Sequence, residues 1–319
     1  SHELFNAVVG GIGLLGIITE ATLQLKPIPS PFVEINRIPA TDVDALLANL
    51  RMLDRYIDRA PLFNWAQFRW FEALIALYDL YEITGHPWLL DLACKLHAQG
   101  FNWAAFFERW PLIQPTPKGR WNYMGHVVNN AMAVKAHGLW YRLSGDERDR
   151  RAVQRMIDQL DRHHGMVTGM FTGDECLAGR RPTQGTELCA VVEYAYSLEM
   201  LLSALGEPAF GDRLERIVFN ALPATFSPDM WSHQYDQQAN QIECSARDDW
   251  PWTTNGPESN LFGVEPNYGC CTASIVTTRA QVTLVVQFLI AGTIVSAVGV
   301  LLCNPVLADP SQIQQVISM

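Results

Sequence analysis

Four residues that could hold a metal ion lie in two short segments of this 319-residue chain. Glu187 and Cys189 are two positions apart, while Cys270 and Cys271 are adjacent and directly follow a glycine. Three thiolates and one carboxylate match the soft, four-coordinate sites that Zn²⁺ occupies in proteins. Because no paired Cys-x-x-Cys pattern is present, the same residues also fit ordinary buried cysteines. The pattern therefore predicts a zinc site and leaves simple packing as the alternative.

The composition excludes several classes of protein. The seven cysteines are odd in number and widely spaced, which argues against a disulfide scaffold. A formal net charge of −10 is the opposite of a basic nucleic-acid footprint, so no nucleic-acid partner is expected. The 10 Trp, 9 Tyr and 14 Phe residues exclude intrinsic disorder. No charged leader or cleavage site is visible, so no signal peptide is predicted and the localisation is left open.

The elements that must position the four residues are predicted to be helices. Apolar spacing predicts a helix over 68–84 that ends at Gly85, and a second from Trp88 to His97 that stops at Gly100. Further helices are predicted near 124–143, 146–162, 185–204 and 207–220. Short connections marked by Gly or Pro favour antiparallel helix pairs, so the fold class is mainly α, a toroid or bundle of helix pairs.

Five segments of this helical region resemble one known family. They are 74–93, 125–132 (Gly-His-Val-Val-Asn-Asn-Ala-Met), 169–176 (Gly-Met-Phe-Thr-Gly-Asp-Glu-Cys), 185–189 (Gly-Thr-Glu-Leu-Cys) and 268–272 (Tyr-Gly-Cys-Cys-Thr). Over about residues 57–273 the chain resembles glycoside hydrolase family 127, the β-L-arabinofuranosidase group. That resemblance implies an (α/α)₆ barrel followed by β-sandwich domains. It also implies a retaining exo-glycosidase that binds zinc through one Glu and three Cys.

The resemblance assigns a role to each candidate residue. It implies that the zinc ligands are Glu187, Cys189, Cys270 and Cys271. Cys270 is then the nucleophile and Glu175 the acid/base. The sugar contacts that it implies are His126, Glu215 and Tyr235. A carboxyl group that donates a proton near neutral pH needs a raised pKa, so we expect burial to raise the pKa of Glu175.

Each of these roles has a plainer alternative. Asp174, rather than Glu175, could be the acid. Glu215 could pair with Arg213 or Arg216 on an exposed helix face, whereas Tyr235 and His126 could be core residues with satisfied polar atoms. His163 and His164 precede the Gly-Asp-Glu segment and could contact sugar, although solvated loop histidines are the simpler interpretation.

The first part of the chain is glycine-rich. Residues 3–23 are similar to the closing segment of the FAD-binding domain in FAD-linked oxidases of the vanillyl-alcohol-oxidase type, with the resemblance covering about residues 1–50. It implies a small α+β fragment without the upstream part that holds the pyrophosphate, so FAD is not expected to bind. From the residues alone, Gly10, Gly11, Gly13 and Gly16 fit tight turns in a β-rich piece.

The last part of the chain is strongly apolar. No charged residue occurs from Ala280 to Ala308, and the 22 residues of 282–303 are long enough to cross a membrane. A membrane-spanning helix at 282–303 and a membrane partner are therefore predicted. A buried β-branched segment and a sequence from a fused reading frame are the alternatives.

Together these patterns predict a 1–55 oxidase-like fragment, a 56–275 glycosidase-like helical domain and a 276–319 hydrophobic tail. The family pattern stops after Ala273 and its first helices are replaced, so an incomplete (α/α)₆ barrel is expected. The predicted function is a zinc-dependent retaining glycosidase for L-arabinofuranosides or related sugars, inactive if the truncation opens the barrel. The alternatives are a non-catalytic remnant with structural zinc and a fragment of an FAD-linked oxidoreductase.

Overall fold

A computed structural model of the chain describes residues 42–117, 119–229, 231–241, 243–246, 255–263, 269–271 and 274. The chain divides into two units, Ser1–Ser274 and Ile275–Met319, and every described residue belongs to the first. The resemblance to an FAD-linked oxidase therefore falls almost wholly outside the described residues. The predicted membrane helix at 282–303 lies outside them entirely.

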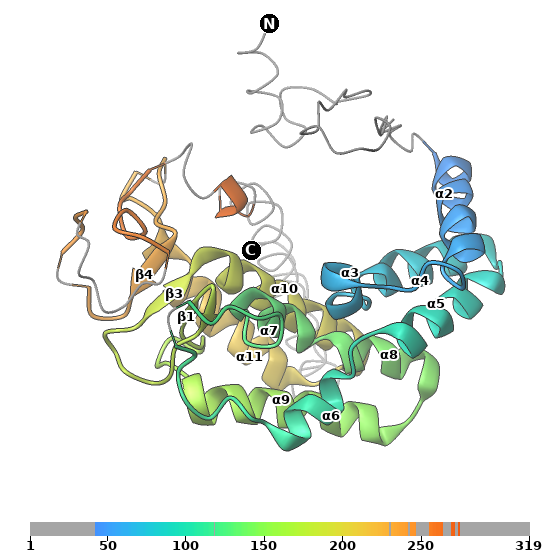
Figure 1. The fold of residues 1–319 in the computed structure, drawn as a ribbon, viewed down its shortest axis with the longest axis horizontal. Coiled ribbons are helices and arrows are strands. Elements are labelled where there is room, and N and C mark those ends of the chain that lie inside the picture. Colours follow the sequence, from blue (N-terminus) through green and yellow to red (C-terminus); the bar gives the residue numbers. More distant parts are fainter. Residues whose placement is uncertain are drawn as a thin grey trace, which may run out of the picture. The chain divides into compact units, whose positions relative to one another are not determined.

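The described part of the chain is mainly helical, as predicted (Figure 1). Its α-helices are α2 (Val43–Tyr56), α3 (Asn64–Phe68), α4 (Glu72–Thr84), α5 (Trp88–Gln99), α6 (Trp103–Arg109), α7 (Val127–Ala133), α8 (Ala136–Ser144), α9 (Glu147–His164), α10 (Leu188–Leu205) and α11 (Pro208–Arg216). A π-helical turn, Ile217–Ala221, and a 3₁₀ turn, Pro223–Thr225, follow α11.

Glycines end several of these helices where the sequence indicates. Gly85, Gly145 and Gly206 follow α4, α8 and α10 with φ of 68°, 61° and 68°, the left-handed conformation that glycine adopts without strain. The helix predicted over 68–84 is interrupted, because α3 ends at Phe68 and α4 begins at Glu72. The helix predicted near 124–143 is likewise two helices, α7 and α8.

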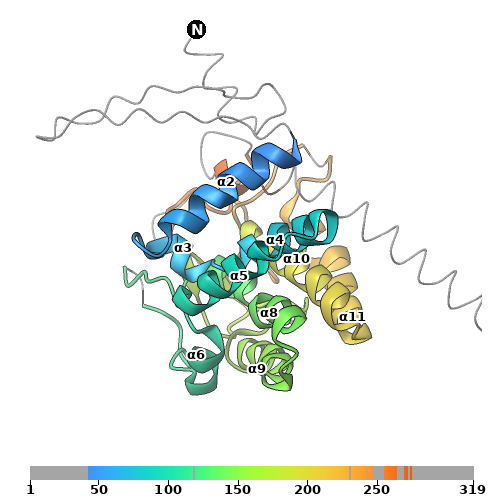
Figure 2. The same cartoon turned by 90° about the vertical axis from the view of Figure 1, so that its right-hand side faces the viewer.

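Consecutive helices pack as pairs, with α4 against α5, α8 against α9, and α10 against α11 (Figure 2). Contacts between the pairs join α4 to α8, and α10 to both α7 and α8. Helix pairs joined in this way are the unit of a helical barrel, and the described residues contain part of one. At the centre is α10, whose length and composition alone would allow it to cross a membrane, although half of that stretch is buried inside the fold.

A small four-stranded sheet lies at the N-terminal end of α10 (Figure 1). Its strands are β1 (Gly173–Asp174), β2 (Cys176–Leu177), β3 (Gly185–Glu187) and β4 (Asp236–Gln238), in the order β2-β1-β3-β4. β1 runs parallel to β3 and antiparallel to β2, while β3 and β4 are antiparallel, with Glu187 opposite Asp236. The prediction of a helix from residue 185 is wrong for the three residues that form β3.

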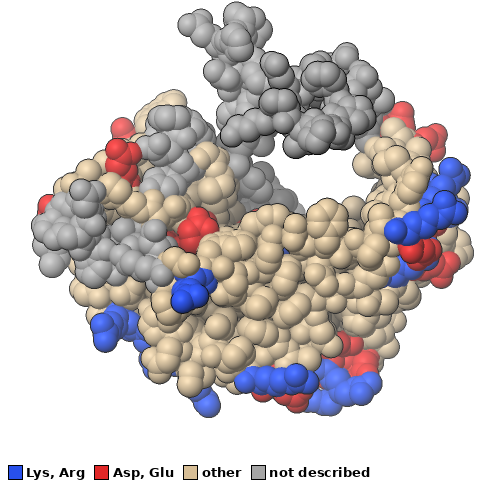
Figure 3. Space-filling model, in the orientation of Figure 1, with Lys and Arg blue, Asp and Glu red and all other residues tan. Residues whose placement is uncertain are grey.

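Both signs of charge occur among the described residues on one face of the protein. On the face shown in Figure 3, Lys and Arg side chains are interspersed with Asp and Glu. The same mixing occurs in the ion pairs of the described residues, for example Arg142 with Glu82 and Arg150 with Glu207, each at 2.7 Å. A basic stripe of the kind that follows a phosphate backbone is absent from the described part of this face.

Candidate active site

Three of the predicted metal ligands lie together. The Sγ atoms of Cys189, Cys270 and Cys271 are all within 4.8 Å of one another, and those of Cys189 and Cys271 are 3.5 Å apart. Cys189 lies in the first turn of α10, whereas the other two lie in a helical turn at residues 269–271. Cys189 and Cys271 are buried and Cys270 is exposed, so one thiol of the cluster is open to solvent.

The carboxylate of Glu187 lies deep in the same region. Glu187 is the last residue of β3 and the cap residue of α10, and it is only 3% exposed. Burial, with the nearby charges of Glu175 and Cys270, raises its pKa well above the usual range. One oxygen accepts a hydrogen bond of 3.1 Å from the backbone N–H of Glu175. A buried carboxylate of this kind is held at a high cost unless a cation or a proton accompanies it.

Contacts among the three thiols shift their pKa values in opposite directions. Hydrogen bonds from Cys189 and Cys271 lower the pKa of Cys270, because they stabilise its thiolate. The same contact with Cys270, together with burial, raises the pKa of Cys189 well above its usual range. Negative charge in the cluster is therefore concentrated on the exposed sulfur of Cys270.

Glu175 occupies a strained position between two strands. It is the single residue that separates β1 from β2. Its φ of 57° lies in the left-handed region, which residues other than glycine rarely adopt. Its backbone C=O accepts a hydrogen bond of 2.9 Å from the N–H of Val127, at the start of α7. This turn fixes the carboxyl group against α7 and β4.

Four side chains surround the carboxyl group of Glu175. Tyr235 donates a hydrogen bond of 3.2 Å and Asn255 one of 3.1 Å to Oε1, while Nε2 of His126 lies 3.6 Å from Oε2. Trp121 is the fourth partner. The close contact with His126, above all, lowers the pKa of Glu175. The expectation that burial raises this pKa is therefore wrong, because donors to the charged form outweigh desolvation.

His126 and Tyr235, two predicted sugar contacts, are buried beside Glu175. His126 is 6% exposed and caps α7, where its Nδ1 accepts a hydrogen bond of 3.1 Å from the N–H of Asn129. That bond fixes the ring so that Nε2 faces the carboxyl group of Glu175. Tyr235 is 1% exposed, and its backbone C=O accepts the N–H of Leu188 at 2.9 Å, which joins it to the start of α10.

The other predicted residues lie elsewhere. Glu215 is exposed on α11, while its neighbour Arg213 pairs with Asp161 of α9, so the structure does not bring Glu215 to Glu175. His164 lies in the last turn of α9 rather than in a solvated loop. It is fully buried, and its two ring nitrogens contact Leu112 and Gly179.

Asp174, the alternative acid, is the last residue of β1 and directly precedes the turn residue Glu175. It is 1% exposed and accepts a hydrogen bond of 3.2 Å from the backbone N–H of Asn255. It lines a cavity of about 490 Å³ together with Arg180 and Arg181, among others. Asn255 donates to both acids, through its backbone N–H to Asp174 and through its side chain to Glu175, so the two carboxyl groups lie on either side of one residue.

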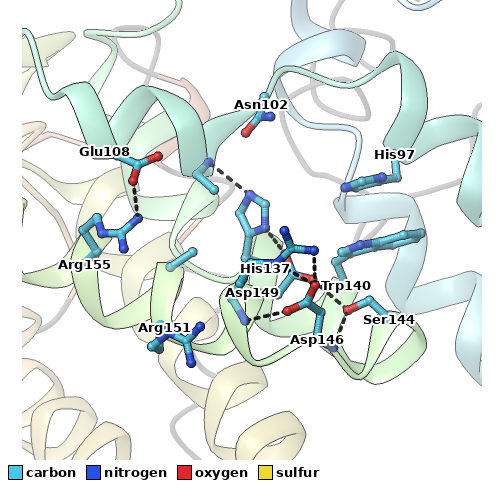
Figure 4. A pocket seen from close by; sticks show the side chains of 13 residues that line it. His97, Asn102, Glu108, His137, Trp140, Ser144, Asp146, Asp149, Arg151 and Arg155 are labelled. Carbon is cyan, nitrogen blue, oxygen red and sulfur yellow. Dashed lines mark hydrogen bonds and ion pairs between the residues drawn. The ribbon is translucent and has the colours of Figure 1, made fainter.

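A second cavity, of about 500 Å³, lies among α5, α6, α8 and α9 (Figure 4). Its polar groups are largely paired with one another: Nδ1 of His137 contacts Asp149 at 2.8 Å, and Ser144 donates to Asp149 at 2.7 Å. The rings of His97 and Trp140 stack with centroids 3.8 Å apart. None of the predicted site residues is among those that line it. This cavity is therefore not the candidate active site.

Comparison with known proteins identifies the family. The sequence model described as "Beta-L-arabinofuranosidase, GH127 catalytic domain" matches residues 66–283. The chain belongs to this family. The match includes the thiol cluster and Glu175, so the site that the structure brings together lies within the GH127 catalytic domain.

Solved structures show the same fold. One, titled "Glycoside hydrolase", has 16% sequence identity and a TM-score of 0.52, with 73% of this chain and 41% of that chain covered. Another, Ara127N-Se, "a GH127 beta-L-arabinofuranosidase from Geobacillus Stearothermophilus T6", has 17% identity, a TM-score of 0.50 and the same coverage. The chain thus spans about two fifths of the length of these proteins.

Among curated proteins, one from Streptomyces coelicolor is similar over a short stretch. It is described as "Uncharacterized protein in mprA 5'region" and is 45% identical over 47 residues. These residues are 15% of this chain and 13% of that protein.

The structure adds site residues that the sequence reasoning missed. Asn255 donates to Glu175 from a loop distant in sequence. Asn129 positions His126, and Trp121 bonds to Glu175. Asn129 lies within the Gly-His-Val-Val-Asn-Asn segment that carries the family resemblance, so its place beside His126 was a usable signal. Asn255 and Trp121 carry no spacing signal, because only the tertiary fold brings them to the site.

Proposed function

We propose that this chain is the helical part of a zinc-dependent retaining glycoside hydrolase that removes L-arabinofuranosyl groups. The observation that carries the proposal is the position of Glu175. Its carboxyl group contacts His126 and Tyr235, and its backbone N–H donates a hydrogen bond to Glu187. A carboxyl group beside a nucleophile is the arrangement that retaining glycoside cleavage requires. The L-arabinofuranosyl group comes from the family description and from the relative of Geobacillus.

The donor set fits zinc. Three thiol sulfurs within 4.8 Å of one another can share one small cation, and Glu187 supplies a buried carboxylate beside them. Glu187, Cys189, Cys270 and Cys271 would hold the ion. When bound, Zn²⁺ supplies positive charge that keeps the thiols deprotonated at neutral pH.

Glu175 acts twice in the proposed reaction. In the first step its protonated carboxyl group gives the proton to the glycosidic oxygen, and the bond between that oxygen and the anomeric carbon breaks. The sulfur of Cys270 supplies the electron pair that forms a new carbon–sulfur bond on the opposite side. The leaving group departs as an alcohol, and Glu175 remains as a carboxylate.

In the second step the carboxylate takes a proton from water. The oxygen of that water bonds to the anomeric carbon, the carbon–sulfur bond breaks, and the electron pair returns to Cys270. Two inversions give net retention, and Glu175 is protonated again for the next cycle. In the unliganded protein the pKa of Glu175 is lowered, so a sugar that excludes water and competes for its donors must raise that pKa before the first step.

The experiment that tests this proposal uses the full chain. Bound zinc is measured by elemental analysis, and release of p-nitrophenol is measured from its L-arabinofuranoside. We expect about one zinc per chain and turnover that Glu175→Gln and Cys270→Ser each reduce by at least two orders of magnitude. Cys94→Ser is the matched control, since Cys94 is an exposed free thiol on α5 outside the cluster.

The outcomes separate the proposal from its alternative. Zinc binding without turnover by the wild-type chain would contradict the glycosidase and favour a structural zinc site. Turnover that survives Cys270→Ser would contradict the assigned nucleophile. A chain that binds no zinc with all thiols reduced would contradict the metal site itself.

A further inference from the structure

An aromatic cluster lies directly beside the candidate acid. Trp65 of α3 packs edge-to-face against Trp121, Tyr123 and His126, with ring centroids 5.5, 5.0 and 5.3 Å away. Trp121 in turn packs against Tyr123 at 4.9 Å and His126 at 5.6 Å. Four rings from two segments, α3 and residues 121–126, thus form one surface. His126 and Trp121 both contact the carboxyl group of Glu175, so this surface continues into the site.

Two of these rings are open to solvent. Trp65 and Trp121 are each 42% exposed, although large aromatic side chains are usually well buried. The guanidinium group of Arg69 lies 4.5 Å over the ring of Trp65 and covers one face of it, while the indole as a whole stays 42% exposed. Two half-exposed indoles in contact form an apolar surface next to a polar site, the combination found in ligand pockets.

Buried neighbouring residues hold the aromatic cluster in place. Tyr123 stacks on the buried ring of Phe68 at 4.7 Å with an interplanar angle of 9°, and Phe68 packs against Trp103, which is fully buried. Arg69 is fixed by a hydrogen bond of 2.8 Å from its Nε to Asn129, whose own N–H bonds to His126. A surface whose rings are already ordered loses little entropy when a ligand stacks on it.

We infer that Trp65 and Trp121 form a stacking subsite for the leaving group, fitted to a second sugar ring that presents a C–H face. This inference rests on the proposed function, because Glu175 must be the acid. The group that receives a proton from Glu175 is the leaving group, and the aromatic surface adjoins that carboxyl group through Trp121 and His126. The thiol cluster and Glu187 instead act on the sugar that is cleaved off, because Cys270 bonds to the anomeric carbon of that sugar in the proposed reaction.

The test compares two substrates that share the cleaved sugar. One is methyl L-arabinofuranoside, whose leaving group has no ring, and the other is a disaccharide of L-arabinofuranose. Replacing Trp65 by Ala should raise KM for the disaccharide on the order of tenfold, the loss of one aromatic contact. KM for the methyl glycoside should change by less than about twofold. Trp65→Phe, which keeps a ring, should recover most of the loss.

Trp88→Ala is the matched control. Trp88 is also a half-buried indole with a guanidinium over its ring, that of Arg51 at 3.6 Å, but it lies on α5 and shares no ring contact with the cluster. We expect this variant to treat both substrates as the wild type does. Far-ultraviolet circular dichroism of all three variants checks that each is folded.

Two results would overturn the inference. Equal losses on both substrates would mean that Trp65 supports the cleaved sugar or the acid rather than the leaving group. Unchanged kinetics on both would mean that the cluster only packs.

If the wild-type chain cleaves neither substrate, the proposed function fails. The inference is then decided by calorimetric titration of the disaccharide into the wild-type and Trp65→Ala proteins. Weaker binding by Trp65→Ala than by the wild type supports the subsite. Equal binding, or no binding to the wild type, overturns it.

Discussion

Lys135 should be the most sensitive ion-pair position in the helical core. Its side chain is fully buried, with Nζ 2.6 Å from Glu72 Oε1 and 3.9 Å from Glu193 Oε2. Nζ also lies over the rings of Phe71 and Tyr196, at 5.5 and 5.1 Å. Glu72 is on α4, and Glu193 is on α10, one turn after the predicted ligand Cys189. The ammonium of Lys135 therefore links α10 to α4.

The magnitude follows from these distances. With an effective dielectric constant of about 20, the attractions amount to about 6 and about 4 kcal/mol. Replacing Lys135 by Met removes both but also removes the desolvation cost of the ammonium, which is several kcal/mol. A net loss of about 3–5 kcal/mol in the free energy of unfolding remains, because Glu72 and Glu193 both lose the ammonium that they share. That loss corresponds to a fall in Tm of roughly 6–20 °C.

The loss should also grow with pH. Burial raises the pKa of Glu72 in the folded protein, and the charge of Lys135 opposes that rise. Without Lys135 the folded-state pKa rises further, so the native state retains a proton that the unfolded chain releases. Stability is then retained below the unfolded pKa of about 4.3 and lost as the pH rises through the folded value.

Urea denaturation and thermal unfolding between pH 5 and pH 8 measure both effects. The matched control is Lys95→Met, because Lys95 pairs with Asp54 and Asp58 on the surface and should be nearly neutral. Adding Glu72→Gln to Lys135→Met should restore part of the stability and flatten the pH dependence. A Lys135→Met protein that unfolds within about 1 kcal/mol of the wild type at pH 8 would refute the reasoning.

Three further predictions concern the site. Tyr235→Phe removes a hydrogen-bond donor from the carboxylate of Glu175 and should raise the pKa of Glu175. The basic limb of the pH profile of kcat/KM should therefore move up by about one pH unit. A pH profile identical to that of the wild type contradicts this. Gly185→Ala would place a Cβ against the carboxyl group of the buried Asp236, so either that side chain or β3 must shift, and bound zinc and Tm should both fall. Gly211→Ala, whose Cβ would meet Leu202 at 3.6 Å, is its control. Removing zinc by chelation should lower Tm, and returning zinc alone should restore it; a chelated chain with unchanged Tm contradicts that site.

The sequence predicts the helical class well, since helix signals are local. Gly85 and Gly206 end their helices in the left-handed conformation, and Asp146 caps α9 by accepting the N–H of Arg148. The short strands are a different case. Gly185, Thr186 and Glu187 precede a long apolar helix and have no periodicity of their own, so their strand conformation depends on β1 and β4.

The site shows the same division. The family resemblance names Glu175, Glu187 and the three cysteines, and the structure places these residues in one region. Glu215 has a similar sequence signal but lies exposed on α11, because helix periodicity assigns its face to solvent. The lowered pKa of Glu175 could not be read from the sequence, since its cause is a set of donors that only the tertiary fold brings together.

The backbone of Glu175 links the strain of the fold to the chemistry of the site. A left-handed conformation costs a residue with a Cβ roughly 1–2 kcal/mol, and glycine would occupy this turn without that cost. With a glutamate at this position, the turn directs a carboxyl group towards His126 and Tyr235, while the flanking residues remain paired in β1 and β2. Its N–H simultaneously holds Glu187, so one strained residue sets the positions of both carboxyl groups. The proposed acid therefore holds a proposed metal ligand through its backbone, so a shift of the turn at Glu175 would displace the carboxylate of Glu187 as well.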